Sequence, residues 1–300
     1  MNDFIPAISH AAPRVDRLSH FGLTTQRIER LVRFFVLAFD CQEVARVRRS
    51  GCEFERLMGV RGGATAATLK LGAASIEILE FDFPGNPYLS NLSPFDNQFQ
   101  HFALVVDDMD AAFARLSSVA GWSPISSSGP QQLPAGSGGV KAFKFRDPDG
   151  HPLELLGFPH EKKPEYWRIQ PSGRLFLGID HSAISCFNAV QSIDFYRRIG
   201  LEVAARSFNH GIEQERLDGV FAPQLDVIAL TPAAPTPHVE LLSYRNRAAG
   251  RTAPINSNDL SATRLIFQRA AVPCANPADA LMFDPDGHHL LIRGIDSRSN

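Results

Sequence analysis

The chain has 300 residues, a length typical of about two domains, and its hydrophobic content of 44% is sufficient for a sizeable core. The formal charge is −2, from 30 basic and 32 acidic residues, so no strong field favours nucleic acid or an anionic membrane as a partner. The four cysteines form no CxxC pair, and no apolar run reaches the ~18 residues of a membrane helix. The first six residues lack the basic and apolar segments of a signal peptide, so we expect a cytoplasmic protein.

Two units of similar order occupy the first half of the chain. Residues 18–24 form a predicted strand that contains His20, a helical pattern follows over 26–39, and strand-like segments lie at 52–58, 65–71 and 74–81, the last containing Glu77. The order then repeats from a strand at 99–106 that contains His101. A helix begins after Asp108, a Ser/Gly/Pro-rich loop covers 123–139, and a hairpin ends the unit at Glu154.

The second half repeats this order with losses. A Pro-rich and charged linker covers 159–173, and a third unit then opens with His181 in a strand and closes with Glu240 in another. In the fourth unit Thr263 stands where we expect the histidine. Only 28 residues separate it from Leu291, which leaves no room for a helix and a second strand.

Two hairpins share the turn Asp-Pro-Asp-Gly. They span 143–156 and 283–292, and the turn chemistry is clear: proline presets φ, aspartate binds nearby backbone, and glycine takes a positive φ. The seventh residue after the first aspartate is Glu154 in one copy and Leu291 in the other. A carboxylate within an apolar run is costly unless it is paired or bound to a cation, so Glu154 is a candidate metal ligand.

The histidines and glutamates recur with a regular spacing. His20, His101 and His181 stand about 80 residues apart, and each is followed by a strand glutamate between 53 and 59 residues later. This period is longer than that of solenoid repeats. It predicts an α+β fold built from several copies of a compact βαβββ module.

The hairpins together with the His-strand and Glu-strand order resemble the vicinal oxygen chelate superfamily, which includes glyoxalase I, extradiol dioxygenases, and fosfomycin- and bleomycin-resistance proteins. The resemblance implies tandem βαβββ modules paired into two half-open β-barrel domains, with a truncated fourth module. It places an N-terminal domain at 14–158, a linker at 159–173 and a degenerate C-terminal domain at 174–296. It also implies a complete metal site from His20, Glu77, His101 and Glu154. His181 and Glu240 are then interpreted as vestigial or paired with each other.

The chemistry of these donors supports the same interpretation. Two imidazoles and two carboxylates suit a divalent Zn, Ni, Co, Mn or Fe ion, and four protein ligands leave two positions for a substrate with neighbouring oxygens. Such a metal would act as a Lewis acid, and a displaced Glu154 or Glu77 would move a proton. We therefore expect a glyoxalase-type lyase or isomerase that acts on a small carbonyl or hydroxycarbonyl compound.

Two other functions are compatible with the sequence. A non-haem Fe(II) extradiol-type dioxygenase would need a triad of two histidines and one carboxylate, which His20, His101 and Glu154 supply only if Glu77 stays off the metal. A resistance protein that binds a small molecule without chemistry would need no metal. Neither substrate nor oligomeric state follows from the sequence, and a homodimer is left open by the sheet edge of the shortened fourth unit.

Several further residues are interpreted as structural. His151, His288 and His289 follow turns and are placed at the rim. Arg48, Arg49, Arg56 and Arg61 are interpreted as a solvated face in preference to an anion site. The loops 84–97 and 123–139 are the candidate lids, because mobile loops over a rigid scaffold often carry function.

Overall fold

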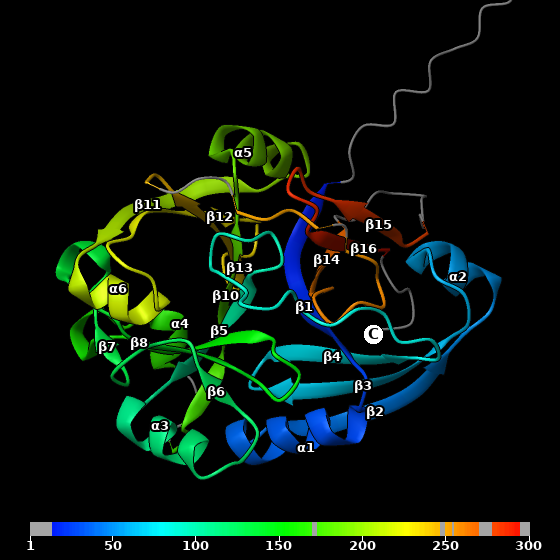
Figure 1. Cartoon of the computed structure of the whole chain (residues 1–300), viewed down its shortest axis with the longest axis horizontal. Helices are drawn as coiled ribbons and strands as arrows, with labels where there is room; N and C mark the ends of the chain where they lie inside the picture. The colour runs from blue at the N-terminus through cyan, green and yellow to red at the C-terminus, as the bar shows by residue number, and fades with distance from the viewer. Residues whose placement is uncertain (1–13, 170–172, 247–249, 254, 270–277, 295–300) are drawn as a thin grey trace, which may run out of the picture.

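The computed structural model, drawn in Figure 1, describes residues 14–169, 173–246, 250–253, 255–269 and 278–294. Cys274 and the end of the predicted C-terminal domain lie outside these residues. Among the described helices none is long and apolar enough to cross a membrane. The predicted fold class is confirmed: the chain is α+β, with three successive βαβββ-like units and a short fourth unit.

The first two units follow the predicted order apart from an unpredicted strand at 42–49, two short strands within the predicted loop 123–139, and a helix at 52–58. The first unit consists of β1 (Val15–Thr25), α1 (Ile28–Phe39), β2 (Gln42–Arg49), α2 (Cys52–Met58), β3 (Ala64–Leu71) and β4 (Ala74–Phe81). The second consists of β5 (Gln100–Val106), α3 (Met109–Ser117), β6 (Ser123–Pro124), β7 (Gln131–Gln132), the 3-10 turn η1 (Ala135–Ser137), β8 (Lys141–Arg146) and β9 (Pro152–Gly157). Residues 52–58 were expected to be strand-like, but they form a short helix between two glycines of positive φ.

The second half begins with a short linker that contains η2 (His160–Lys162) and α4 (Glu165–Arg168). The third unit then consists of β10 (Phe176–Ser185), α5 (Ala189–Arg198), β11 (Glu202–His210), α6 (Ile212–Asp218), β12 (Gln224–Thr231) and β13 (His238–Tyr244). The described part of the fourth unit consists of β14 (Arg264–Arg269), β15 (Ala280–Phe283) and β16 (His289–Arg293).

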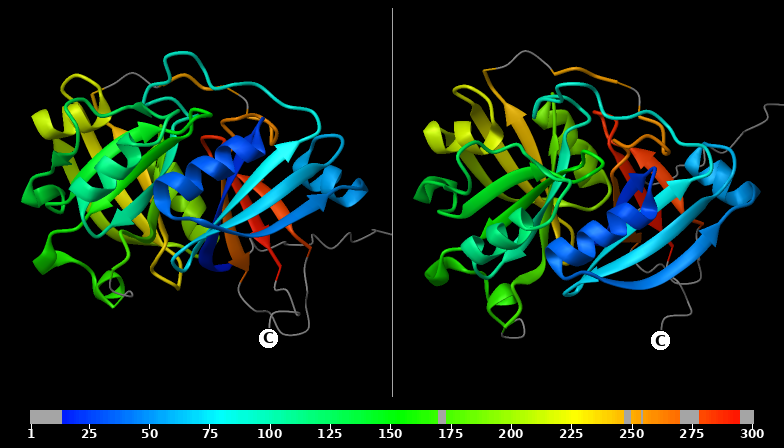
Figure 2. Two further views of the ribbon diagram at one scale, coloured as in Figure 1. Left: turned by 90° about the horizontal axis from the view of Figure 1, so that it is seen from below. Right: turned by 60° about the horizontal axis from the view of Figure 1, so that its bottom comes forward.

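The units pair across the two halves of the chain, and this overturns the predicted pairing. One sheet has the order β15-β16-β14-β1-β4-β3-β2, so the first unit pairs with the fourth. The other has the order β11-β12-β13-β10-β5-β9-β8-β6, so the second unit pairs with the third. The predicted linker at 159–173 therefore connects strands of one sheet, and neither sheet corresponds to the predicted domain at 14–158 or at 174–296. Figure 2 shows the two curved sheets side by side.

The main core joins both sheets and the helices α1, α3 and α5. Alternate residues of β1, β5 and β14 enter it, and the aromatic pair Phe21–Phe102 connects the two sheets with ring centroids 5.3 Å apart. The apolar residues of α1 recur at helical spacing, so they form one face of the helix that packs on this junction. At the end of the helix, Phe39 contacts Phe145 of the second unit. The core therefore covers one face of each sheet and leaves the opposite, concave face for a cleft.

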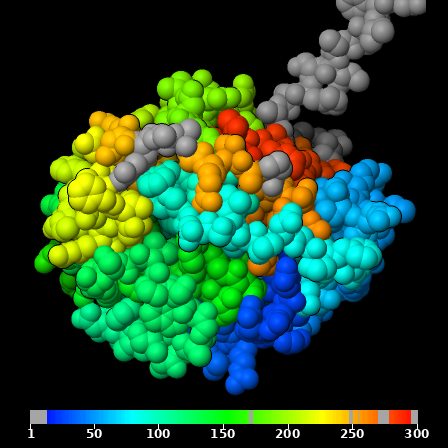
Figure 3. All heavy atoms as spheres, in the orientation of Figure 1, coloured from blue at the N-terminus to red at the C-terminus, as the bar shows by residue number. Residues whose placement is uncertain are grey.

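A belt of loops also joins the halves. The loop 84–97, expected to be a lid, instead lies beside residues 250–253 and 255–262, as the adjacent cyan and orange surfaces in Figure 3 show. Asp96 accepts hydrogen bonds from the backbone and side chain of Arg251, and Asp259 accepts from Asn86. These contacts give the loop a structural role.

The two Asp-Pro-Asp-Gly turns fasten one unit to the next. In the first turn Asp147 accepts from His151 Nδ1 at 2.7 Å, and His151 Nε2 donates to the carbonyl of Thr24 in β1 at 2.9 Å. The second turn repeats the pair as Asp284 and His288. His151, His288 and His289 are each at most 2% exposed, so their placement at the rim is wrong. They are buried because each turn docks against the neighbouring unit.

The buried contacts of His151 with Asp147 and Thr24, here called the His151 clamp, predict a contribution to the free energy of unfolding that depends on pH. Burial alone would lower the pKa of His151, but the charge of Asp147 and its hydrogen bond outweigh burial and raise that pKa. A raised pKa stabilises the fold fully below the unfolded value of about 6.5, and this contribution is lost as pH rises through the folded pKa. We expect His151→Gln to lower the free energy of unfolding by about 2 kcal/mol at pH 6 and by less at higher pH.

Urea unfolding from pH 5.5 to 9 of the wild type and of this variant tests the clamp, with His160→Gln as the control because His160 is exposed. A deficit that does not change with pH, or that grows as pH rises, would contradict the charged state of the clamp.

Candidate metal centre

Four adjacent strands at the middle of the nine-stranded sheet carry the candidate ligands. They are β13, β10, β5 and β9, which hold Glu240, His181, His101 and Glu154 respectively. The register places His101 opposite Ala183, which also pairs with Glu240 in β13, while Ala103 pairs with Glu154. Because side chains two apart share a face, alanine follows each histidine on the concave face and leaves room above the sheet.

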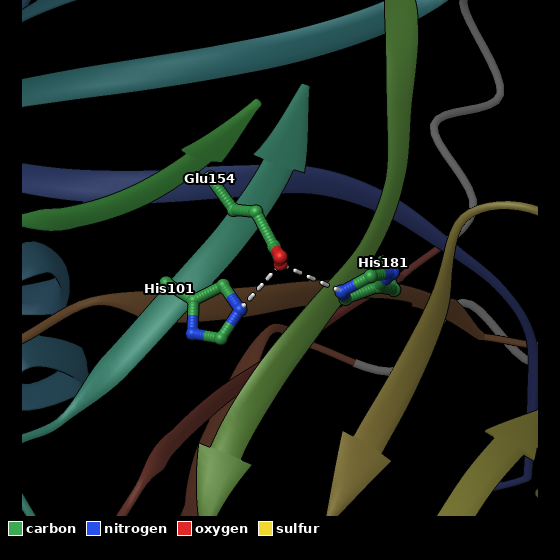
Figure 4. Close-up of side chains that lie close together, drawn as sticks. All are labelled: His101, Glu154 and His181. Carbon is green, nitrogen blue, oxygen red and sulfur yellow. Dashed lines mark hydrogen bonds and ion pairs between the residues drawn. The ribbon is translucent and has the colours of Figure 1, made fainter. Parts of the chain in front are cut away.

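The donor atoms of His101, Glu154 and His181 converge, as Figure 4 shows. His101 Nε2 lies 3.0 Å from Glu154 Oε2, and His181 Nε2 lies 3.6 Å from the same oxygen. Glu240 Oε2 lies 3.5 Å from His181 Nε2. A divalent ion with ligands at ~2.1 Å separates neighbouring donors by ~3 Å, so these spacings fit a metal with little movement.

His181 has the supporting contact that metal-binding histidines commonly have. Its Nδ1 lies 3.1 Å from Asp180 Oδ2, and Asp180 Oδ1 accepts from the indole of Trp167 at 3.0 Å. A carboxylate on Nδ1 fixes the tautomer and ring orientation and leaves Nε2 free for a metal. A register shift between Ile179 and Ser182 occurs at this position, and such irregularities re-aim side chains.

Asp180, His181 and His238 form a second group of donors within reach of one another. Asp180 is already held by Trp167, and His238 Nε2 lies 3.6 Å from Glu240 Oε1. This group therefore suits the support of His181 and Glu240 better than a separate ion.

Charges in the centre are strongly coupled. Burial alone would raise the pKa of Glu154, but hydrogen bonds with His101 and His181 and the charge of Lys144 hold it well below its usual range. Burial and then the charge of Lys144 lower the pKa of His101. Burial also opposes the charged form of His181, yet Glu240 and Asp180 raise its pKa well above the ordinary value. The carboxylates around His181 therefore favour a positive charge at its ring, which a bound proton or a metal cation could supply.

The centre lies in a cavity of about 370 Å³ between this sheet and the α6 side of the third unit. Its wall is largely aliphatic and aromatic, formed by Leu133, Val140, Leu156, Phe158, Leu217, Leu225, Val227 and Leu242. Residues Gly136, Ser137 and Gly138 also line the cavity, so part of the predicted lid 123–139 does border the site.

One buried polar network lies at the edge of this cavity. Lys144 Nζ binds Asp218 Oδ1 at 2.8 Å, and Asp218 Oδ2 accepts from Gln214 at 2.8 Å and from Tyr244 at 2.9 Å. Gln214 lines the cavity and is 2% exposed, and its Oε1 has no hydrogen-bond partner among the described residues. A buried acceptor without a partner is costly, so this oxygen is suited to a ligand that donates a hydrogen bond.

The structure does not bring the four predicted ligands together, so that set is wrong as a single site. His101 and Glu154 are in contact, but His20 and Glu77 belong to the other sheet. There Glu77 is paired with Arg49 and Arg293, and His20 Nδ1 contacts Ser19 Oγ at 2.9 Å. The two residues interpreted as vestigial, His181 and Glu240, take their place beside His101 and Glu154.

Comparison with known proteins gives one sequence match and a set of similar folds. Residues 17–155 match the family described as the Glyoxalase/Bleomycin resistance protein/Dioxygenase superfamily. The structure of glyoxalase I from Zea mays is 14% identical, covers 92% of both chains and has a TM-score of 0.57. A mutant of the same maize enzyme has a TM-score of 0.59 at the same identity and coverage. The comparison with curated proteins found no relative.

Proposed function

We propose, from the premise that the chain belongs to the glyoxalase/bleomycin resistance protein/dioxygenase superfamily, that it is a metal-dependent lyase or isomerase. The reaction would take place in the cleft shared by the second and third units. The observation that carries the proposal is the convergence of two histidines and two glutamates from four adjacent strands on one small cavity.

His101, His181, Glu154 and Glu240 would hold the metal. The mixture of imidazole and carboxylate donors suits divalent Zn, Ni, Co, Mn or Fe. A bound divalent ion would supply Lewis-acid polarisation of substrate oxygens. The chain itself supplies orientation, since Asp180 holds the His181 ring and the sheet holds the other three donors.

Glu240 is the better candidate for moving a proton. Its contacts with His181 and His238 are 3.5 and 3.6 Å, longer than the 3.0 Å contact of Glu154, and its side chain is 21% exposed against 7%. Burial alone would raise the pKa of Glu240, but the charge of His181 together with the hydrogen bond and charge of His238 outweighs burial and lowers that pKa. A loosely held carboxylate at neutral pH can accept a proton from a carbon beside a carbonyl group.

The cavity favours a small substrate with an apolar part. A volume of about 370 Å³ suits a compact molecule, and the aliphatic wall would bind a hydrocarbon group next to the oxygens that face the metal ligands. Gln214 Oε1 would accept a hydrogen bond from a substrate hydroxyl. We therefore propose a carbonyl or hydroxycarbonyl compound that carries an aliphatic or aromatic substituent.

Proton exchange tests this function without knowledge of the product. The metal-reconstituted protein is incubated in D2O with a panel of dicarbonyls and hydroxycarbonyls, and proton NMR follows deuterium entry beside the carbonyl. We expect exchange with wild type and at least a hundredfold slower exchange with Glu240→Gln, when the two proteins are compared at equal metal occupancy. Glu77→Gln is the matched control because Glu77 lies in the other sheet. Equal loss in both variants would contradict the role of Glu240.

A second candidate function rests on the same cluster. If Glu240 stays with His238, the remaining His101, Glu154 and His181 form two histidines and one carboxylate, the ligand set of non-haem Fe(II) oxygenases. Oxygen uptake with Fe²⁺ and a panel of catechols separates the two functions. Uptake that requires the protein, without deuterium exchange, would favour an extradiol-type dioxygenase over the lyase or isomerase.

A further inference from the structure

The seven-stranded sheet has a modified copy of the metal centre. In the nine-stranded sheet His101 pairs with Ala183, two residues after His181; in the other sheet the partner of Gly22, two residues after His20, is Arg264. Arg264 therefore occupies the place of His101. Thr263, expected there from the sequence, lies one residue away. By the same register Leu291 occupies the place of Glu154.

Arginines supply the positive charge in this copy. Arg264 is fully buried, donates to Ser257 O and Thr24 Oγ1 at 2.9 Å each, and packs closely against Gly22. A Cβ atom at Gly22 would lie 3.1 Å from Arg264 Nε. Glu77 keeps its place but is paired with Arg49 and Arg293. Guanidinium groups thus neutralise the carboxylate that a metal would otherwise bind.

Beside these ion pairs lies a wide cavity with an excess of cationic side chains. It has a volume of about 1140 Å³. Among the described residues its lining includes Arg17, Arg48, Arg49, Arg56 and Arg293 but only two carboxylates, Glu53 and Asp279. Arg49 and Arg293 contact Glu77 behind the surface, and Arg48 contacts Asp82. Among the described residues no carboxylate is within ion-pair distance of Arg17 or Arg56, so their charge is available to a ligand.

The polar groups deeper in the cavity agree with an anion. Arg293 Nε is buried without a hydrogen-bond partner among the described residues. His20 also lines the cavity, and burial together with the charge of Arg293 lowers the pKa of His20 to about 4. The imidazole is therefore neutral at pH 7, and its environment disfavours a further positive charge. Metal cations would meet the same repulsion.

We propose that this arginine cavity is a second binding site, which takes a small oxyanion with phosphate or carboxylate groups. Planar guanidinium groups match such oxygens in pairs. Arg17 and Arg56 would contact the ligand directly, while Arg49 and Arg293 keep Glu77 neutralised and add charge beneath it. The site is separate from the metal centre, and its existence does not depend on the proposed reaction. This interpretation replaces the solvated face expected for Arg48, Arg49 and Arg56.

Calorimetric titration of the full chain tests the site. The protein is first treated with a chelator and dialysed, so that the ligands cannot act through a metal, and is titrated at low ionic strength with inorganic phosphate, pyrophosphate and citrate. We expect binding of at least one of these anions, weakened about tenfold or more in the double variant Arg17→Ala with Arg56→Ala. The three anions separate a phosphate site from a carboxylate site.

The control is a second double variant, Arg27→Ala with Arg33→Ala, which removes the exposed N-cap arginine of α1 and an exposed arginine within the helix, both outside the cavity lining. Binding by this control and by His181→Ala is expected to match wild type, while thermal unfolding confirms that each variant is folded. No binding by wild type, or equal weakening in the two double variants, would overturn the proposal. Loss of binding in His181→Ala would overturn it too, because the anion would then belong to the metal centre.

Discussion

Replacing His181 with alanine is expected to abolish tight binding of a divalent metal. His181 Nε2 lies between Glu154 and Glu240, at 3.6 and 3.5 Å, so its removal leaves two carboxylates without the donor that joins them. We expect metal affinity to fall more than a hundredfold, since loss of a supporting residue alone commonly costs 10–100-fold. Elemental analysis after purification and competition with a chromophoric chelator would measure the loss.

Two variants serve as controls for this prediction. His20→Ala is expected to keep the metal, because His20 lies in the other sheet and the pKa of its imidazole is held low by burial and Arg293. Asp180→Asn keeps the shape of the side chain but weakens its hold on His181, and should reduce affinity by about 10–100-fold. If His181→Ala kept its metal and His20→Ala lost it, the present site would be contradicted in favour of the ligand set that includes His20.

The sequence is sufficient to predict the modules because their signals are local. Apolar alternation, the position of a histidine in a first strand and the Asp-Pro-Asp-Gly turns all lie within short segments. The resulting fold class is confirmed, and residues 17–155 match the family model. The identity of His101 and Glu154 as neighbours also follows from within one unit, where β5 and β9 pair directly. Short-range pattern thus locates half of the candidate centre.

The partner of each module is a long-range property that no single segment encodes. Each half of the chain contains two units. When two such halves form a closed arrangement, the first unit of each half pairs with the second unit of the other half, as in a two-fold symmetric dimer. A comparison within the sequence would have suggested this. Residues 51–59 and 211–219 share six of nine residues, which relates the first unit to the third, and the Asp-Pro-Asp-Gly turns relate the second to the fourth.

Side-chain substitutions that depend on register are still harder to predict. Thr263 is the residue expected at the histidine position of the fourth unit, but a difference of one position brings Arg264 there instead. Glu77 resembles a ligand by its place in a strand, and only the fold reveals Arg49 and Arg293 beside it. Neither arginine lies near Glu77 in the sequence, so the neutralised state of that carboxylate follows from tertiary structure alone.

Asp218→Asn is expected to destabilise the fold by about 3 kcal/mol. Lys144 and Asp218 are at most 4% exposed, and their atoms are 2.8 Å apart. Asparagine keeps the size of the side chain but leaves the ammonium of Lys144 buried without its nearest counter-charge. Glu154 lies on the strand opposite Lys144, and its charge offsets part of the loss. Urea unfolding of the metal-free protein measures the change.

Adding Lys144→Met to this variant distinguishes the loss of charge pairing from the loss of hydrogen bonds. Methionine removes the buried ammonium and nearly preserves the volume, so the double variant should recover most of the lost stability if the unpaired charge is the cause. If the hydrogen bonds of Gln214 and Tyr244 to Asp218 are the larger contribution, the double variant stays as unstable as Asp218→Asn. Recovery without a change in the slope of the unfolding curve would assign the network at the cavity edge to electrostatic pairing, and would explain why α6 of the third unit is held against β8 of the second.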